Sequence, residues 1–209
     1  MTEKHGETVD ASTVFSDLVA GNERYRGGLE KMEHPNMSDK VREALALPPG
    51  QHPKVCVLGC ADSRVPPEII FDQGLGDILS IRIAGNILND DIIGSMEFAC
   101  KLTGSKLIVV LGHTKCGAIE GACNNVELGH LTHLLNKIKP AIDMETEISA
   151  NRNAGNKTFI NNVTRNNIHL AVNEIRKQST LLAEMEKEKL IKIVGGLYDI
   201  ESGAVTFYE

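Results

Sequence analysis

The chain has 209 residues, of which 42% are apolar and 24% are charged, and it carries a formal net charge of −6. It has no block of Lys and Arg that could follow a phosphate backbone, which excludes nucleic acid as an expected partner. No apolar run is long enough to cross a bilayer, and the first ten residues lack the apolar stretch of a secretory signal. We therefore expect a cytoplasmic protein that does not bind membranes.

The first 50 residues are predicted to form a helical arm. Residues 12–27 have the apolar spacing of a helix, with Ser12 as the expected N-cap and Gly27 and Gly28 as the stop. Residues 30–47 predict a loop and a short helix before a Pro-Pro-Gly turn. We interpret the whole chain as one domain, with an arm at 1–50 and an α/β core at 51–209.

The core alternates short apolar runs with helical patterns. The predicted strands are residues 54–59, 77–83, 106–112, 190–198 and, after a turn, 204–208. The predicted helices are residues 66–71, 91–102 and a broken helical stretch over 118–186. This order favours an α/β fold with a mostly parallel four-stranded sheet, an added antiparallel edge strand and flanking helices.

Two clusters of reactive residues lie where predicted strands end. Cys60-Ala-Asp62-Ser-Arg64 follows the first strand, and His113-Thr-Lys-Cys116 follows the third. Sites in such sheets lie at the carboxyl ends of the strands, near a topological switch point. Thiolates and imidazoles are the ligands that zinc prefers, and three of them with one open position make a catalytic site.

Each cluster taken alone also has an ordinary explanation. Asp62 and Arg64 could form a surface ion pair, and a His-x-x-Cys pattern is a weak signal. A structural zinc site would need four Cys or His ligands, and no fourth has an evident place near these turns. We therefore favour an open zinc site held by Cys60, His113 and Cys116. The other cysteines are interpreted as small core residues: Cys56, Cys100 and Cys123.

Three blocks, at residues 60–65, 82–86 and 112–117, resemble the signature blocks of the β-class carbonic anhydrases. The similarity extends from residues 20–25 to residues 196–199 and so covers almost the whole chain. The resemblance implies a zinc lyase that reversibly hydrates carbon dioxide to bicarbonate and a proton, by attack of zinc-bound hydroxide. It also implies that Asp62 orients this hydroxide and that Arg64 holds Asp62. In some relatives the aspartate instead binds zinc as a fourth ligand, in a closed state.

The resemblance further implies a set of substrate contacts. Gln51 matches a glutamine that reaches substrate across a dimer interface, and the N–H of Gly117 could stabilise bicarbonate. By periodicity alone, the apolar members of the set are ordinary core residues. The full set is Gln51, Leu79, Ala84, Gly85, Phe98 and Gly117.

The resemblance to the β-class carbonic anhydrases also implies an assembly and leaves two alternative functions open. The functional unit implied is a homodimer, with the N-terminal helix over the partner, or a tetramer. One alternative keeps the fold and metal but hydrolyses carbonyl sulfide or carbon disulfide. The other is a non-catalytic zinc protein or redox sensor.

A bacterial subtype of the family that is inhibited by bicarbonate has a Trp three residues before the first zinc cysteine. This chain has Val57 at that position, so we expect no inhibition of that kind.

Overall fold

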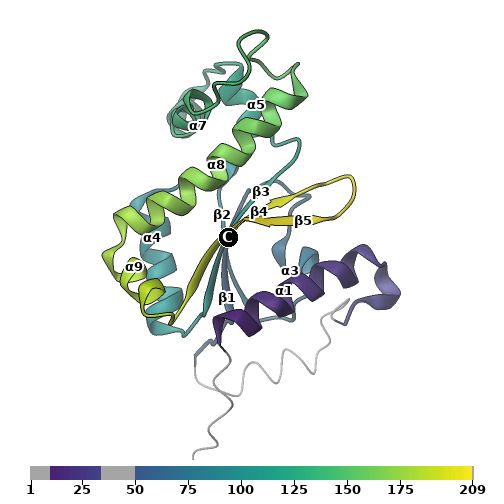
Figure 1. Ribbon diagram of the computed structural model, residues 1–209, viewed down its shortest axis with the longest axis vertical. Coiled ribbons are helices and arrows are strands. Elements are labelled where there is room, and N and C mark those ends of the chain that lie inside the picture. Colours follow the sequence, from purple (N-terminus) through teal and green to yellow (C-terminus); the bar gives the residue numbers. More distant parts are fainter. Residues whose placement is uncertain (1–9, 34–49, 209) are drawn as a thin grey trace, which may run out of the picture.

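The computed structural model describes residues 10–33 and 50–208, which are built around one central sheet (Figure 1). The sheet has five strands in the order β2-β1-β3-β4-β5, and only β5 runs antiparallel to its neighbour. This confirms the predicted α/β fold and its antiparallel edge strand. The strands are β1 (Val55–Gly59), β2 (Ile78–Arg82), β3 (Leu107–His113), β4 (Lys192–Tyr198) and β5 (Val205–Tyr208).

Helices cover both faces of the sheet (Figure 1). One face packs against α1 (Ala11–Arg26) and α3 (Pro67–Ile70). The other packs against α4 (Asp90–Glu97), α8 (Lys157–Gln178) and α9 (Thr180–Lys187). A third cluster joins α5 (Gly117–Cys123), α6 (Gly129–Asn136) and α7 (Lys139–Asp143) to the first half of α8. The remaining helical segments are two 3-10 helices, η1 (Leu29–Lys31) and η2 (Ala84–Asn86), and the π-helix η3 (Phe98–Leu102).

The apolar runs form strands because both faces of the sheet are covered. Successive side chains of a strand point to opposite faces, so a strand covered on both sides is apolar throughout. In β1, Val55 and Val57 face α1 while Cys56 and Leu58 face α8, and all four are fully buried. The prediction that Cys56, Cys100 and Cys123 are core residues is confirmed by their burial, which raises the pKa of each thiol.

Two local predictions are corrected. The N-cap of α1 is Asp10 rather than Ser12, because the Asp10 carboxylate accepts a hydrogen bond from Thr13 N at 2.8 Å. A carboxylate also interacts favourably with the positive end of the helix dipole. The helix predicted at 91–102 is α-helical only to Glu97, and Phe98–Leu102 continue it as a π-helix. Most of the short helix predicted within 30–47 lies outside the described residues.

Helix α1 is fixed to the core by a close backbone contact and one buried amide. Asn22 is 3% exposed, and its amide donates to the carbonyls of Ile70 and Gly203 and accepts from Val205 N. The neighbouring Gly21 has room for no side chain, since an added Cβ would lie 1.8 Å from the carbonyl oxygen of Phe71. The apolar face of α1 therefore packs on its own sheet, and the arm over a partner subunit stays a prediction. No helix in the described part of the chain is long and apolar enough to cross a membrane.

We expect Gly21→Ala to lower the free energy of unfolding by about 1–3 kcal/mol, because α1 must move away from the Phe71 carbonyl. This loss outweighs the gain in helix propensity. Val19→Ala is the matched control, since Val19 is an exposed residue of the same helix and should change stability by less than about 0.5 kcal/mol. Urea denaturation followed by circular dichroism measures both, and equal midpoints for the two variants would contradict the docking of α1.

Candidate metal centre

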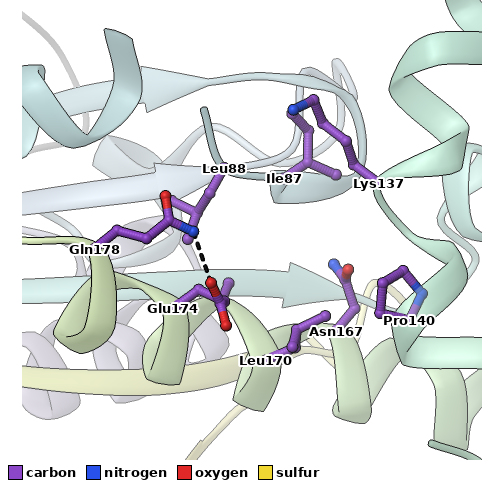
Figure 2. Close-up of a pocket in the computed structure, with 9 residues that line it drawn as sticks. Ile87, Leu88, Lys137, Pro140, Asn167, Leu170, Glu174 and Gln178 are labelled. Carbon is purple, nitrogen blue, oxygen red and sulfur yellow. Dashed lines mark hydrogen bonds between the residues drawn. The ribbon is translucent and has the colours of Figure 1, made fainter. Parts of the chain in front are cut away.

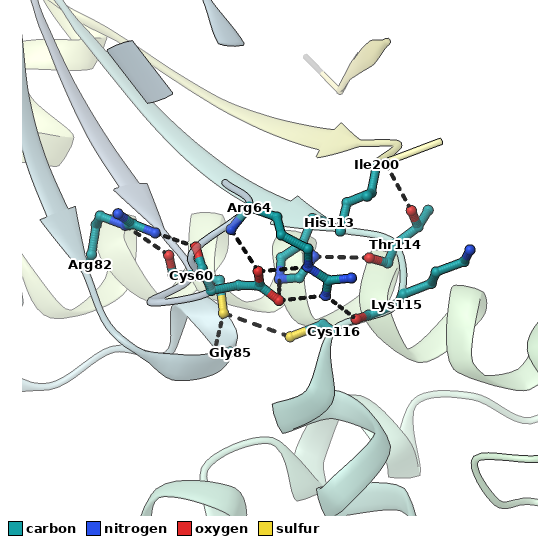
Figure 3. A network of polar contacts seen from close by, with 10 residues as sticks. Cys60, Arg64, Arg82, Gly85, His113, Thr114, Lys115, Cys116 and Ile200 are labelled. Atoms are coloured by element: carbon teal, nitrogen blue, oxygen red, sulfur yellow. Dashed lines mark hydrogen bonds and ion pairs between the residues drawn. The ribbon is translucent and has the colours of Figure 1, made fainter. Parts of the chain in front are cut away.

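The topology of the sheet brings the two predicted clusters together. From β1 the chain crosses to β2 on one side and then to β3 on the other, so the switch point lies between β1 and β3. These two strands are paired in parallel with Gly59 opposite Leu111. Cys60 follows β1 directly, His113 is the last residue of β3, and Cys116 is the N-cap of α5. All three predicted ligands therefore meet at one edge of the sheet (Figure 3).

The geometry of these three residues fits a zinc ion. Their ligand atoms lie within 4.8 Å of one another, and the sulfurs of Cys60 and Cys116 are 3.8 Å apart. Two thiolates bound at about 2.3 Å in tetrahedral geometry are separated by about the same distance. His113 is fully buried, and its Nδ1 donates to the Thr114 carbonyl at 2.9 Å. Its Nε2 has no hydrogen-bond partner among the described residues, as expected for a nitrogen that receives a metal.

The two cysteines affect each other's ionisation. Their mutual hydrogen bond, with smaller contributions from His113 and the Gly85 N–H, lowers the pKa of Cys60 to about 4. The same hydrogen bond and burial raise the pKa of Cys116. One thiol of the pair is thus favoured to ionise and the other to keep its proton. A divalent cation held here would replace the shared proton, and two thiolates would then compensate its charge.

Asp62 and Arg64 form a clamp beside the three ligands. The Arg64 guanidinium donates to both carboxylate oxygens of Asp62 at 2.9 and 2.6 Å, and the Arg64 N–H donates to one of them at 2.9 Å. These hydrogen bonds lower the pKa of Asp62 to about 2, so the carboxylate is ionised at every physiological pH. Asp62 Oδ2 lies 3.9 Å from His113 Nε2. Both residues of the clamp line a cavity of about 690 Å³ that is also lined by Thr114, Lys115 and Gly117.

The loop backbone around the ligands is held by side chains from other elements (Figure 3). Arg82 of β2 donates to the carbonyl of Cys60 at 3.0 Å and also to that of Asp62. Lys115 has a φ of 57°, a strained conformation for a residue with a side chain. Its carbonyl accepts from Arg64 at 3.2 Å, and its ammonium forms an ion pair with Glu201.

Thr114 connects the ligand loop to the turn between β4 and β5. Its hydroxyl donates to Asp199 Oδ1 at 3.2 Å and accepts from Ile200 N at 3.1 Å. Sequence reasoning did not assign a role to Thr114, Asp199 or Glu201. The residues of the Thr114–Asp199 contact lie 85 positions apart, and the one available signal was that both follow strands that end at the same edge.

The predicted substrate residues divide into two groups. Ala84 and Gly85 form η2 beside Cys60, and Gly117 begins α5 next to Cys116. The other three lie away from the metal centre of their own chain. Leu79 pairs with Cys56, near the amino end of β1, and shares an open cavity of about 630 Å³ with Phe98. Gln51 is exposed and precedes β1.

Comparison with known proteins gives the same family from sequence and from structure. A family model described as carbonic anhydrase matches residues 55–205. Carbonic anhydrase 2 of Mycobacterium tuberculosis is 34% identical over 191 residues, which cover 89% of this chain and 87% of that protein. The β-carbonic anhydrase CafA of Aspergillus fumigatus is 26% identical, with a TM-score of 0.69 over 93% of this chain and 90% of that one. The chain belongs to the β-class carbonic anhydrases.

A further group of solved structures has the same fold. Tetrameric β-carbonic anhydrases of Sordaria macrospora have a TM-score of 0.67, at 22% identity, over 92% of this chain and 95% of the matched chain. Hydration of carbon dioxide is the general activity of the family, so this carbonic anhydrase acts on a small molecule. Within residues 10–33 and 50–208, the Cys-His-Cys group is suited to hold a metal.

We expect Cys60→Ser and Cys116→Ser to lose bound zinc, because a serine hydroxyl does not ionise to replace a thiolate ligand at neutral pH. Elemental analysis of the purified protein should give about one zinc per chain before the substitution. Cys123→Ser is the matched control, since Cys123 is buried on α5 but is not among the three clustered ligands. Zinc retained in full by Cys60→Ser would mean that the metal lies elsewhere.

Proposed function

We propose that this carbonic anhydrase is a zinc enzyme that interconverts carbon dioxide and bicarbonate at the Cys60–His113–Cys116 centre. The observation that supports it most strongly is the buried ligand group, with all ligand atoms within 4.8 Å, beside an ionised Asp62. When bound, zinc supplies a Lewis acid that makes hydroxide available near neutral pH. Overall, one water adds to carbon dioxide to give bicarbonate, and the proton released from that water passes to the solvent.

In this proposal Asp62 orients the attacking oxygen. Its carboxylate accepts a hydrogen bond from the oxygen and so turns a lone pair toward carbon dioxide. Arg64 holds the carboxylate at both oxygens, which keeps Asp62 in place and ionised. The same two contacts favour the open state over the closed one, because they occupy Asp62 with Arg64 rather than with the metal. The N–H of Gly117 is proposed to stabilise bicarbonate.

The Asp62–Arg64 clamp favours a catalytic zinc site over a purely structural one. A structural site has no use for an arginine that positions a carboxylate beside its ligands. We therefore rank the non-catalytic zinc protein and the redox sensor below the enzyme. Hydrolysis of carbonyl sulfide or carbon disulfide would use the same fold and metal, and release of sulfide distinguishes it from hydration of carbon dioxide.

Stopped-flow hydration of carbon dioxide tests the proposal, and we expect activity to rise between pH 6.5 and 9. Asp62 has a pKa of about 2 and stays ionised over this range, so it contributes nothing to the rise. Two thiolates reduce the metal's positive charge, so water is acidified less than by a metal held by three neutral imidazoles. A flat profile would contradict this account. Zinc-loaded protein without hydration, but with release of sulfide from carbonyl sulfide, would favour the alternative substrate.

Asp62→Asn should lower kcat by about 100-fold at pH 8.5, since the amide keeps the shape but orients the oxygen poorly. Zinc content should remain near that of the unaltered protein, because Asp62 is not among the three clustered ligands. Asp143→Asn, at an exposed position at the end of α7, is the control for a lost negative charge. An unchanged kcat for Asp62→Asn would remove the orienting role.

We further propose that the functional unit is a homodimer or a tetramer that uses the open face around Phe98. Phe98 is 43% exposed and its neighbour Leu102 is 74% exposed, although both are large apolar side chains. A partner on this face would cover them and bring Leu79, Phe98 and Gln51 toward a shared site. Tetramers among the similar structures agree with such an assembly.

Phe98→Glu should reduce the molar mass measured by light scattering from that of an oligomer to that of a monomer, because a charge cannot be buried without a partner. Leu128→Glu is the control, since Leu128 is 67% exposed near α6, in a different part of the fold. A fully active monomer before substitution would contradict the proposed assembly.

A cytoplasmic location and a single functional domain complete the proposal. No disulfide joins any of the five cysteines, all of which lie in the described residues, and this suits a reducing compartment. The arm at 1–50 and the core at 51–209 are proposed to act as one unit, because Asn22 connects α1 to the turn that holds the ligand loop.

A further inference from the structure

The backbone at Gly85 makes direct contact with a metal ligand. Its N–H donates to the sulfur of Cys60 at 3.3 Å. Its φ of 70° suits glycine, and an added Cβ would lie 2.9 Å from Cδ1 of Ile138 and 3.2 Å from Cβ of Ala118. Packing against Ile138 and Ala118 fixes where Gly85 lies, and its polar contacts set how its N–H and carbonyl are oriented. The position of the N–H against the thiolate therefore depends on what binds the rest of Gly85.

That contact comes from α8, far away in the sequence. Nδ2 of Asn167 donates to the Gly85 carbonyl at 2.9 Å, and Asn167 is only 4% exposed. The Asn167 amide faces a cavity of about 360 Å³ between α8, Ile87 and Pro140 (Figure 2). A continuous series of contacts thus runs from α8 through Gly85 to Cys60.

We propose that Asn167 is a positioning residue for the metal centre, acting through Gly85. By fixing the Gly85 carbonyl it keeps the adjacent N–H directed at the Cys60 thiolate. A hydrogen bond to a ligand orients it and adjusts how strongly it donates electrons to the metal. The inference rests on the proposed zinc site and adds to it a residue that touches neither ligand nor substrate.

The neighbouring Asn166 provides a control within the same helix. It also donates through its amide to a backbone carbonyl, that of Ala141 in α7, at 3.2 Å. This contact joins α8 to α7 and does not reach Cys60. Loss of either amide removes one side-chain hydrogen bond from α8, but Asn166 is half-buried whereas Asn167 is buried. The Asn166 variant therefore reports the effect of losing such a bond on α8, and only the Asn167 variant alters the metal centre.

The experiment compares the zinc-loaded forms of the unaltered protein, Asn167→Ala and Asn166→Ala. Zinc release to a chromogenic chelator should be about tenfold faster for Asn167→Ala, at the lower end of the range for outer partners of metal ligands. Asn166→Ala should stay within about twofold of the unaltered protein. In cobalt-substituted protein, the thiolate-to-metal charge-transfer band should move to longer wavelength for Asn167→Ala alone, because a thiolate without its hydrogen bond donates more strongly.

Equal release rates and unchanged cobalt bands for the two variants would overturn the inference. Should Asn167→Ala fail to fold, Asn167→Ser serves instead, because its hydroxyl is one bond shorter than the amide and leaves the Gly85 carbonyl unbound. Failure of the proposed function is distinguishable, since the unaltered protein itself would then bind no zinc or hydrate no carbon dioxide.

Discussion

The parallel pairing of β1 with β3 is the constraint on which the metal centre depends. It sets Gly59 opposite Leu111, so that Cys60 and His113 leave the sheet at the same edge. Parallel strands of one sheet end on the same side, and the crossover through β2 makes this edge the switch point. A shift of one residue in this pairing would turn the side chains of one strand to the other face and separate the ligands. Close packing opposes that shift, because different side chains of β1 and β3 fill the space under the helices on the two faces.

The loops beyond these strands are held by three parts of the fold that are separate in sequence. Arg82 of β2 holds the carbonyl groups after β1, Asp199 after β4 holds Thr114, and Asn167 of α8 holds Gly85. Each contact ends on the backbone or on a residue beside a ligand. Buried thiolates can accept hydrogen bonds from several directions. A rigid set of donors around the loops keeps the two sulfurs and the imidazole in one arrangement.

Helix α1 stabilises the centre from a distance. Asn22 binds Gly203 and Val205, which flank the turn whose Asp199 holds Thr114. The hydroxyl groups of Tyr25 and Tyr198 lie 3.1 Å apart and add a second contact between α1 and the end of β4. Helix α1 is therefore part of the support of the metal centre.

The sequence by itself determined the strands, because short apolar runs are a local pattern. It also predicted the three metal ligands and the Asp62–Arg64 pair from two clusters, each only a few residues long. The meeting of Cys60 with Cys116, 56 positions away, depends on the pairing of β1 with β3. Only the tertiary structure decided that Thr114 binds Asp199, that Asn167 binds Gly85, and that Leu79 and Phe98 lie away from the centre of their own chain. The sequence also could not distinguish Asp10 from Ser12 as the N-cap of α1, because both side chains are able to cap a helix. Contacts across 82 or 85 positions depend on the order of the strands and on where each helix crosses the sheet, and no local pattern encodes these.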